Sequence, residues 1–178
     1  MRRLIRVWLP CLLAVSILFA GQGCKRSRKP RVETIEEPGA LASRIQVADP
    51  KYSAQLMKGF HEGENSWRWT RSQFSVALRT PEGAINSGAR LEMNLAIPQA
   101  VIDKVRATTL SATINSVQLA PEKYDKSGQY TFTRDVPASA FTSDAATIDF
   151  SVDRYLAAGE VEMRELGVIV SEVALVAK

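Results

Sequence analysis

The sequence predicts an all-β protein: a single antiparallel β-sandwich of jelly-roll or Ig-like type, with about seven or eight strands. Several short segments alternate between apolar and polar residues with a period of two, which is typical of half-buried strands. Turn-forming residues separate these segments at 81–83, 87–88, 127–128 and 158–159. Only residues 98–106 carry a helical pattern, and this segment is too short to change the fold class.

The expected strands follow in chain order. Ile45 and Val47 alternate in a first short strand, ahead of a turn at Asp49–Pro50. A turn at Asn115–Ser116 is expected before a short strand at 117–119. Regular alternation predicts further strands at 91–97, 110–114, 130–132 and 146–152.

The last apolar segment, 166–176, differs from the others because it is apolar at both parities. Strands buried on both faces have this composition. The apolar parity also changes near Ser171–Glu172, which predicts a β-bulge. This segment is therefore expected to be a central strand with a local irregularity.

Residues 67–78 contain two strand-like groups of opposite parity. Trp67 and Trp69 share one parity, whereas Phe74 and the apolar residues after it share the other. A continuous strand would place the two groups on opposite faces. Either a turn at 70–72 or a bulge would change this, and the polar pair Arg71–Ser72 favours the turn.

The N-terminus has the pattern of an export signal. Three arginines precede an apolar segment at 7–20, which is short for a membrane span and suits a signal peptide over 1–23. Cys24 follows small residues, as in the lipobox of bacterial lipoproteins, and is the candidate site for lipidation with palmitate or a similar fatty acid. Ordinary cleavage and an uncleaved anchor remain alternatives. Residues 24–40 are then a flexible basic tether, and 41–178 the β-sandwich domain.

Charge and cysteine content exclude several function classes. The first 31 residues hold eight of the 23 basic residues and none of the 19 acidic ones, so the remainder carries a net charge of −4. An acidic domain disfavours nucleic-acid binding. Both cysteines, Cys11 and Cys24, lie in the N-terminal segment, so the domain has no disulfide or thiolate chemistry.

The sequence does not contain a catalytic constellation. His61 is the only histidine, and neither a nucleophile elbow nor a second nitrogen ligand for zinc accompanies it. Glu62 and Glu64 are too sparse for a calcium loop, and nothing places two carboxylates at glycosidase separation. We therefore expect a non-enzyme without a cofactor or a metal.

Four short motifs stand out in the domain: Gly59–Phe60 with the nearby glutamates, Trp-Arg-Trp-Thr at 67–70, Asn115, and Arg-Glu-Leu-Gly at 164–167. Together they are similar to small β-sandwich modules of bacterial envelope proteins that resemble carbohydrate-binding domains. Two positions depart from the pattern: Ser116 replaces glycine, and Ala157–Ala158 replaces an expected proline. The resemblance covers about 53–178 and implies a non-catalytic sandwich.

The resulting hypothesis is an exported, envelope-anchored binding module for a glycan or another envelope component. The alternative is a structural or assembly lipoprotein that binds a protein partner. Aromatic rings stack on sugar rings, and neighbouring charged side chains form hydrogen bonds with the sugar hydroxyl groups. The candidate ligand-binding residues lie in the loop and strand at 59–69: His61, Glu62, Glu64, Trp67, Arg68 and Trp69.

The two tryptophans also have a structural interpretation, which the sequence favours over sugar stacking. Tryptophan is highly buried on average, so Trp67 and Trp69 are expected to close the core. Arg68 would then pair with a carboxylate across the sheet, with Arg164 and Glu165 as candidate members of the ion-pair network.

Overall fold

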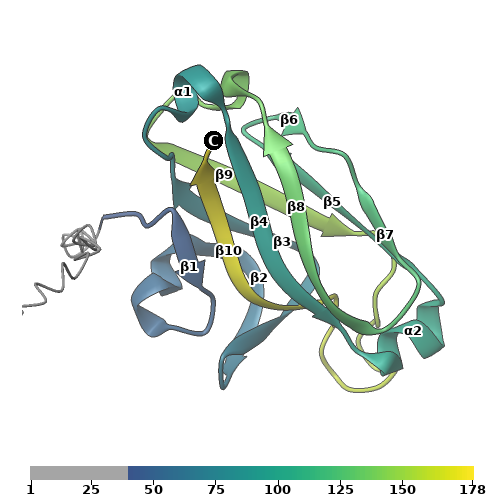
Figure 1. The fold of residues 1–178 in the computed structure, drawn as a ribbon. Helices are drawn as coiled ribbons and strands as arrows, with labels where there is room; N and C mark the ends of the chain where they lie inside the picture. Colours follow the sequence, from purple (N-terminus) through teal and green to yellow (C-terminus); the bar gives the residue numbers. More distant parts are fainter. Residues whose placement is uncertain (1–39) are drawn as a thin grey trace, which may run out of the picture. The chain divides into compact units, whose positions relative to one another are not determined.

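The computed structural model describes residues 40–178 (Figure 1). The predicted signal peptide, Cys24 and all but the last residue of the predicted tether lie outside the described residues. The described elements are β1 (Arg44–Gln46), a 3₁₀ helix (Pro50–Gln55), β2 (Leu56–Glu64), β3 (Trp67–Arg79), α1 (Ala84–Ser87), β4 (Ala89–Ile97), α2 (Gln99–Val105), β5 (Thr108–Ile114), β6 (Val117–Gln118), β7 (Glu122–Tyr124), β8 (Gly128–Val136), a second 3₁₀ helix (Ala138–Ala140), β9 (Ala145–Val152) and β10 (Ile169–Ala177).

The strands form one antiparallel sheet that curls on itself. Its order is β6-β5-β9-β3-β10-β4-β8, with β1 added to β10, β2 to β3 and β7 to β5. Figure 1 shows β10, β4 and β8 crossing in front of β3, β9 and β5. The predicted all-β fold class is confirmed, and the two layers of the sandwich are parts of one continuous sheet.

The regular alternation produces the core. In β4 the buried residues are Leu91, Met93, Leu95 and Ile97, and in β9 they are the even-numbered ones from Ala146 to Val152. These two inner faces meet in a single hydrophobic cluster. The expected strands at 91–97, 110–114, 130–132 and 146–152 are confirmed as parts of β4, β5, β8 and β9, and the helical segment as α2.

The last strand has the predicted character. β10 pairs with β4 along one edge and with β1 and β3 along the other, so it is central. Its register with β4 shifts between Val170 and Glu172, which confirms the bulge at Ser171. None of the helices in residues 40–178 is long and apolar enough to cross a membrane.

The turn expected at 70–72 is wrong, because β3 continues through these residues. β3 pairs with β10 at Arg68 and Trp69 and with β9 only from Gln73 onward, so it passes from one layer to the other. Between the two partners, the Ser72 N–H donates to the Glu165 carboxylate at 2.6 Å. Arg71 and Ser72 are polar because the strand changes partner there.

Candidate functional site

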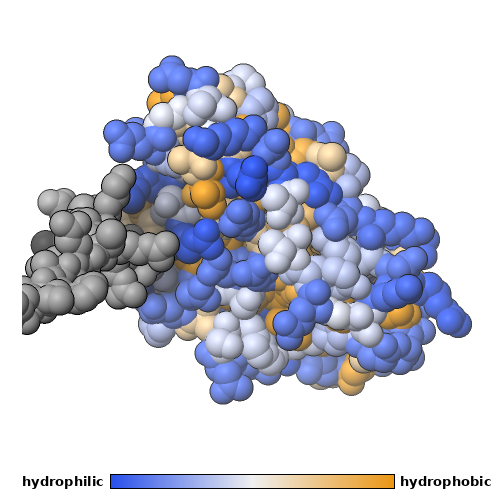
Figure 2. Space-filling view, viewed as in Figure 1, coloured by the Kyte–Doolittle hydropathy of each residue, from blue (hydrophilic) through white to orange (hydrophobic). Residues whose placement is uncertain are grey.

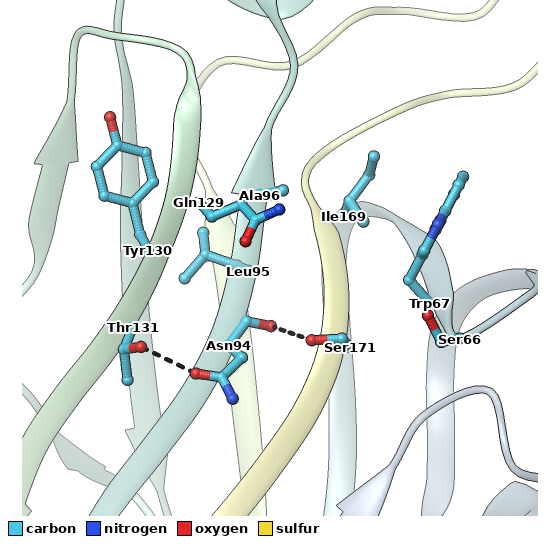
Figure 3. A pocket seen from close by; sticks show the side chains of 10 residues that line it. All are labelled: Ser66, Trp67, Asn94, Leu95, Ala96, Gln129, Tyr130, Thr131, Ile169 and Ser171. Carbon is cyan, nitrogen blue, oxygen red and sulfur yellow. Dashed lines mark hydrogen bonds between the residues drawn. The ribbon is translucent and has the colours of Figure 1, made fainter.

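A surface hollow of about 440 Å³ lies on the outer face of β10, β4 and β8 (Figure 3). This volume falls within the range of small-ligand sites. In Figure 2 the same face is mostly blue or pale, with orange only in separate spots. The hollow is lined by Trp67, by the uncharged polar residues Ser66, Asn94, Gln129, Thr131 and Ser171, and by Leu95, Ala96, Tyr130 and Ile169.

Strand register assembles the polar side of the hollow. Asn94 is opposite Thr131 in the β4–β8 pair, and Ala96 is opposite Gln129. The Thr131 hydroxyl donates to Asn94 Oδ1 at 2.9 Å, which holds the amide in place. Asn94, Gln129 and Thr131 are all exposed, so their remaining hydrogen-bonding capacity faces solvent.

The bulge in β10 adds Ser171 to the same surface. Its hydroxyl lies 3.4 Å from the Asn94 carbonyl oxygen, to which it donates. A bulge adds a residue and redirects the side chain next to it. The irregularity in the last strand therefore borders the hollow.

Trp67 stands on the other side of the hollow. It is the first residue of β3, directly after the hairpin turn at Asn65 and Ser66, where Asn65 has a φ of +56°. Its side chain is half-buried and does not belong to the core cluster. Figure 3 shows its ring edge-on, beyond Ile169 from Asn94 and Gln129.

This arrangement can hold a polar ring compound. An indole face attracts the apolar C–H surface of a sugar, and the amides and hydroxyls across the hollow can exchange hydrogen bonds with its hydroxyl groups. No Asp or Glu is among the lining residues. The lining therefore offers recognition and lacks the paired carboxylates of a glycosidase.

Of the six residues predicted to bind a ligand, the structure places Trp67 in the lining of this hollow. His61 and Glu62 lie on β2, where the His61 ring nitrogen Nε2 donates to the Glu165 carbonyl oxygen at 2.6 Å. Glu64 ends β2 and pairs with Arg164 at 3.3 Å. The loop expected at the start of 59–69 is therefore mostly a strand, because β2 continues to Glu64.

The other two residues have structural contacts. Arg68 donates to the Val47 carbonyl oxygen at 2.6 Å and to the His61 carbonyl oxygen at 2.9 Å. The expected salt bridge from Arg68 to a carboxylate is thus replaced by bonds to the backbone. Trp69 is half-buried and packs against the core cluster. The expectation that the tryptophans close the core is wrong for Trp67, which lies outside the core cluster, whereas Trp69 packs against the cluster.

The Arg-Glu-Leu-Gly segment fits against Trp-Arg-Trp-Thr. The buried Thr70 hydroxyl accepts from the Val168 N–H and donates to the Val168 carbonyl oxygen, both at 3.1 Å. A Cβ on Gly167 would lie 2.6 Å from the Arg71 carbonyl oxygen, so only glycine permits this approach. These two motifs join the layers of the sandwich.

Arg164 and Glu165 also have defined partners. Arg164 pairs with Glu64 and Glu162, both of them surface carboxylates. The bond from Ser72 lowers the pKa of the Glu165 carboxyl below its ordinary value. Among the described residues, neither Arg164 nor Glu165 pairs with Arg68, so the expected ion-pair network around Arg68 is wrong.

Sequence reasoning missed the polar half of the hollow, namely Asn94, Gln129, Thr131 and Ser171. Alternation alone indicates that Asn94 and Thr131 point away from the core. Which strands lie side by side, and in what register, is decided by tertiary pairing. The sequence therefore predicted Trp67, on one side of the hollow, and none of the polar residues on the other side.

A second, smaller hollow of about 240 Å³ lies on the outer face of the other layer. Lys58 and Asp149 line it and form an exposed ion pair at 3.5 Å. Phe150, its one aromatic lining residue, is buried and stacks on Phe74 in the core. Within residues 40–178, no three metal-ligating side chains gather in one place. The first hollow is thus the better candidate for a binding site.

Neither a family model nor a curated protein matches the chain. Among solved structures, it is similar to TmCBM27, a carbohydrate-binding module described for specific mannan recognition, with 12% identity over 78% of this chain and 98% of that chain and a TM-score of 0.45. A family 35 carbohydrate-binding module from an environmental isolate shows 14% identity over 80% and 91%, with a TM-score of 0.40. The CBM51-2 and INT domains of Clostridium perfringens ZmpB show 13% identity over 78% and 28%, with a TM-score of 0.38. These scores are below 0.5, so the function proposed next rests on this chain's own residues.

Proposed function

We propose that the protein is a non-catalytic glycan-binding module and that the hollow bordered by Trp67 is its binding site. One observation carries the proposal: a half-buried tryptophan outside the core stands across a 440 Å³ hollow from several uncharged hydrogen-bonding side chains. Tryptophan side chains in proteins are usually buried, either in the core or against a bound ligand. The protein itself buries only part of the Trp67 side chain, and a bound sugar ring would bury more of it.

The polar residues support the same assignment. Among the described residues, the side-chain nitrogens of Asn94 and Gln129 have no hydrogen-bond partner in the protein, and Asn94 Oδ1 accepts only from Thr131. Exposed amides with free donors and acceptors match the hydroxyl pairs of a sugar. The absence of a carboxylate from the lining favours binding over hydrolysis.

The test compares Trp67→Ala with Trp67→Phe in the full chain. Binding to oligosaccharides and peptidoglycan fragments is measured by calorimetry, alongside the melting temperature Tm. We expect Trp67→Ala to weaken binding at least about fivefold, because stacking on an aromatic ring contributes on the order of 1 kcal/mol or more. Trp67→Phe keeps an aromatic face and is expected to retain most of the affinity.

A matched control lies on the opposite layer. Gln73→Ala removes an exposed polar residue from the second hollow and is expected to leave binding unchanged. Equal affinity of Trp67→Ala and wild type, with folding intact, would contradict the proposed function.

We further propose that the module is exported and anchored to the bacterial cell envelope through a fatty acid on Cys24. The basic n-region, the apolar segment and the small residues ahead of Cys24 support this. Labelling cells with a radioactive fatty acid tests it, with Cys24→Ser as the control. Label on the wild type and none on the variant is expected, and an unlabelled wild type would contradict lipidation.

A further inference from the structure

Every side chain that lines the hollow is uncharged, although charged residues surround it. Asn94 is opposite Glu172 in the β4–β10 pair, and Glu92 lies two residues before Asn94 on the same face of β4. Ser66 follows the hairpin turn after Glu64. Three carboxylates thus lie next to the hollow along the chain or across the sheet.

Two arginines pair with these carboxylates. The Arg44 guanidinium pairs with Glu172 and, at 3.3 Å, with Glu92. Glu172 also accepts a hydrogen bond from the Gln46 amide. On the hairpin side, Arg164 pairs with Glu64 and Glu162. Each arginine therefore pairs with two carboxylates. As a result, each cluster of one arginine and two glutamates has a net negative charge.

We infer that the site selects uncharged glycans and rejects acidic ones such as uronic-acid polymers. This inference rests on the proposed function and specifies the chemical class of its ligand. A carboxylate moved from water into the hollow would lose hydration and find no free cation there. Amides and hydroxyls, in contrast, satisfy sugar hydroxyls without a charge.

The surrounding carboxylates strengthen this selection. Like charges repel through the partly screened surroundings of a protein surface, and the repulsion decreases as salt is added. A neutral sugar does not experience this effect. Its affinity is therefore expected to be nearly independent of ionic strength.

The experiment uses the full chain and two ligand series of equal length. One series consists of neutral hexose oligosaccharides and the other of oligouronates, and affinity is measured by calorimetry at low and high salt. We expect the oligouronates to bind at least about tenfold more weakly than the best neutral ligand. We expect the affinity for the neutral ligand to change less than about twofold with salt.

Two variants of one residue distinguish the effect of an added positive charge on oligouronate affinity from the effect of losing an amide. Gln129 is exposed on β8, and its amide is turned toward the Trp67 side of the hollow in Figure 3. Gln129→Arg supplies the missing cation and is expected to raise oligouronate affinity about tenfold, whereas Gln129→Ala is not. Both variants change an exposed position, so folding is preserved.

The outcomes distinguish this inference from the proposed function. Wild-type binding of oligouronates as tight as that of neutral ligands, and lost in Trp67→Ala, would overturn the selection of uncharged glycans and leave the binding function standing. Binding of neither series would overturn both.

Discussion

Replacing Thr70 with valine tests how the two halves of the sandwich are joined. Thr70 is fully buried, and its hydroxyl both accepts from the Val168 N–H and donates to the Val168 carbonyl oxygen. Valine has nearly the same shape and lacks the hydroxyl. The Val168 carbonyl oxygen keeps its bond from the Thr70 N–H at 2.8 Å. The Val168 N–H, in a residue that is also fully buried, loses its partner.

The expected cost follows from this single orphaned donor. An unsatisfied buried N–H costs about 1–3 kcal/mol, and the gain of one methyl group offsets less than about 1 kcal/mol of it. For a domain of this size, 1 kcal/mol shifts Tm by roughly 3–5 °C. We expect Thr70→Val to lower the free energy of unfolding by about 1–2 kcal/mol and Tm by about 4–8 °C.

The assay is thermal and urea unfolding followed by circular dichroism, with Thr70→Ser as the matched control. Serine keeps the hydroxyl and loses only a methyl group, so it is expected to cost less than valine does. If Thr70→Ser is as destabilising as Thr70→Val, or if Thr70→Val leaves stability unchanged, the hydroxyl is not what joins the layers.

Three further predictions concern the fold. Gly167→Ala should lower the free energy of unfolding by about 1–3 kcal/mol, because its Cβ would lie 2.6 Å from a backbone oxygen of β3. Gly63→Ala should be nearly neutral, because its Cβ would make only ordinary contact, at 3.5 Å, with the flexible Arg68 side chain. Gln55→Leu should cost about 1–3 kcal/mol in urea unfolding, because Gln55 is 5% exposed and makes three hydrogen bonds to the backbone. Glu165→Gln should lower Tm more at pH 7 than at pH 3, because the bond from Ser72 lowers the folded pKa of Glu165. The resulting stabilisation is fully present above the unfolded pKa of about 4.5 and is lost as the pH falls through the folded pKa. Wild-type-like unfolding of Gly167→Ala or Gln55→Leu would contradict the first two expectations. An equal loss of Tm at both pH values for Glu165→Gln would contradict the third.

The candidate site shows how far single residues can be interpreted. Trp67 was found because tryptophan is rare in the chain and stands among β-forming residues. Trp69, two residues away on the same strand, received the same interpretation, yet it packs against the core and Trp67 does not. Trp69 is opposite Ile169 in β10, whereas Trp67 lies at the end of the strand, opposite Glu64 in the hairpin and outside the pairing with β10.

The turn expected at 70–72 was wrong for a related reason. Polar residues in an apolar segment usually indicate a turn. Arg71 and Ser72 instead mark the place where β3 leaves β10 and has not yet joined β9. The Ser72 N–H donates to the Glu165 carboxylate, and Gly167 packs closely against the Arg71 carbonyl oxygen, both more than ninety residues later.

By itself, the sequence determined the all-β class, most strand positions, the central place of the last strand and its bulge. These features depend on local periodicity, because the side chains of a strand alternate every two residues whatever its neighbours are. Only the tertiary structure decided that β4 and β8 place Asn94 beside Thr131, and that Trp67 stands across the hollow from them. Alternation excludes a register slip of one residue, because such a slip would turn the apolar side chains to the other face. It does not determine which distant strands pair or exclude a slip of two residues, and contacts between distant segments decide both.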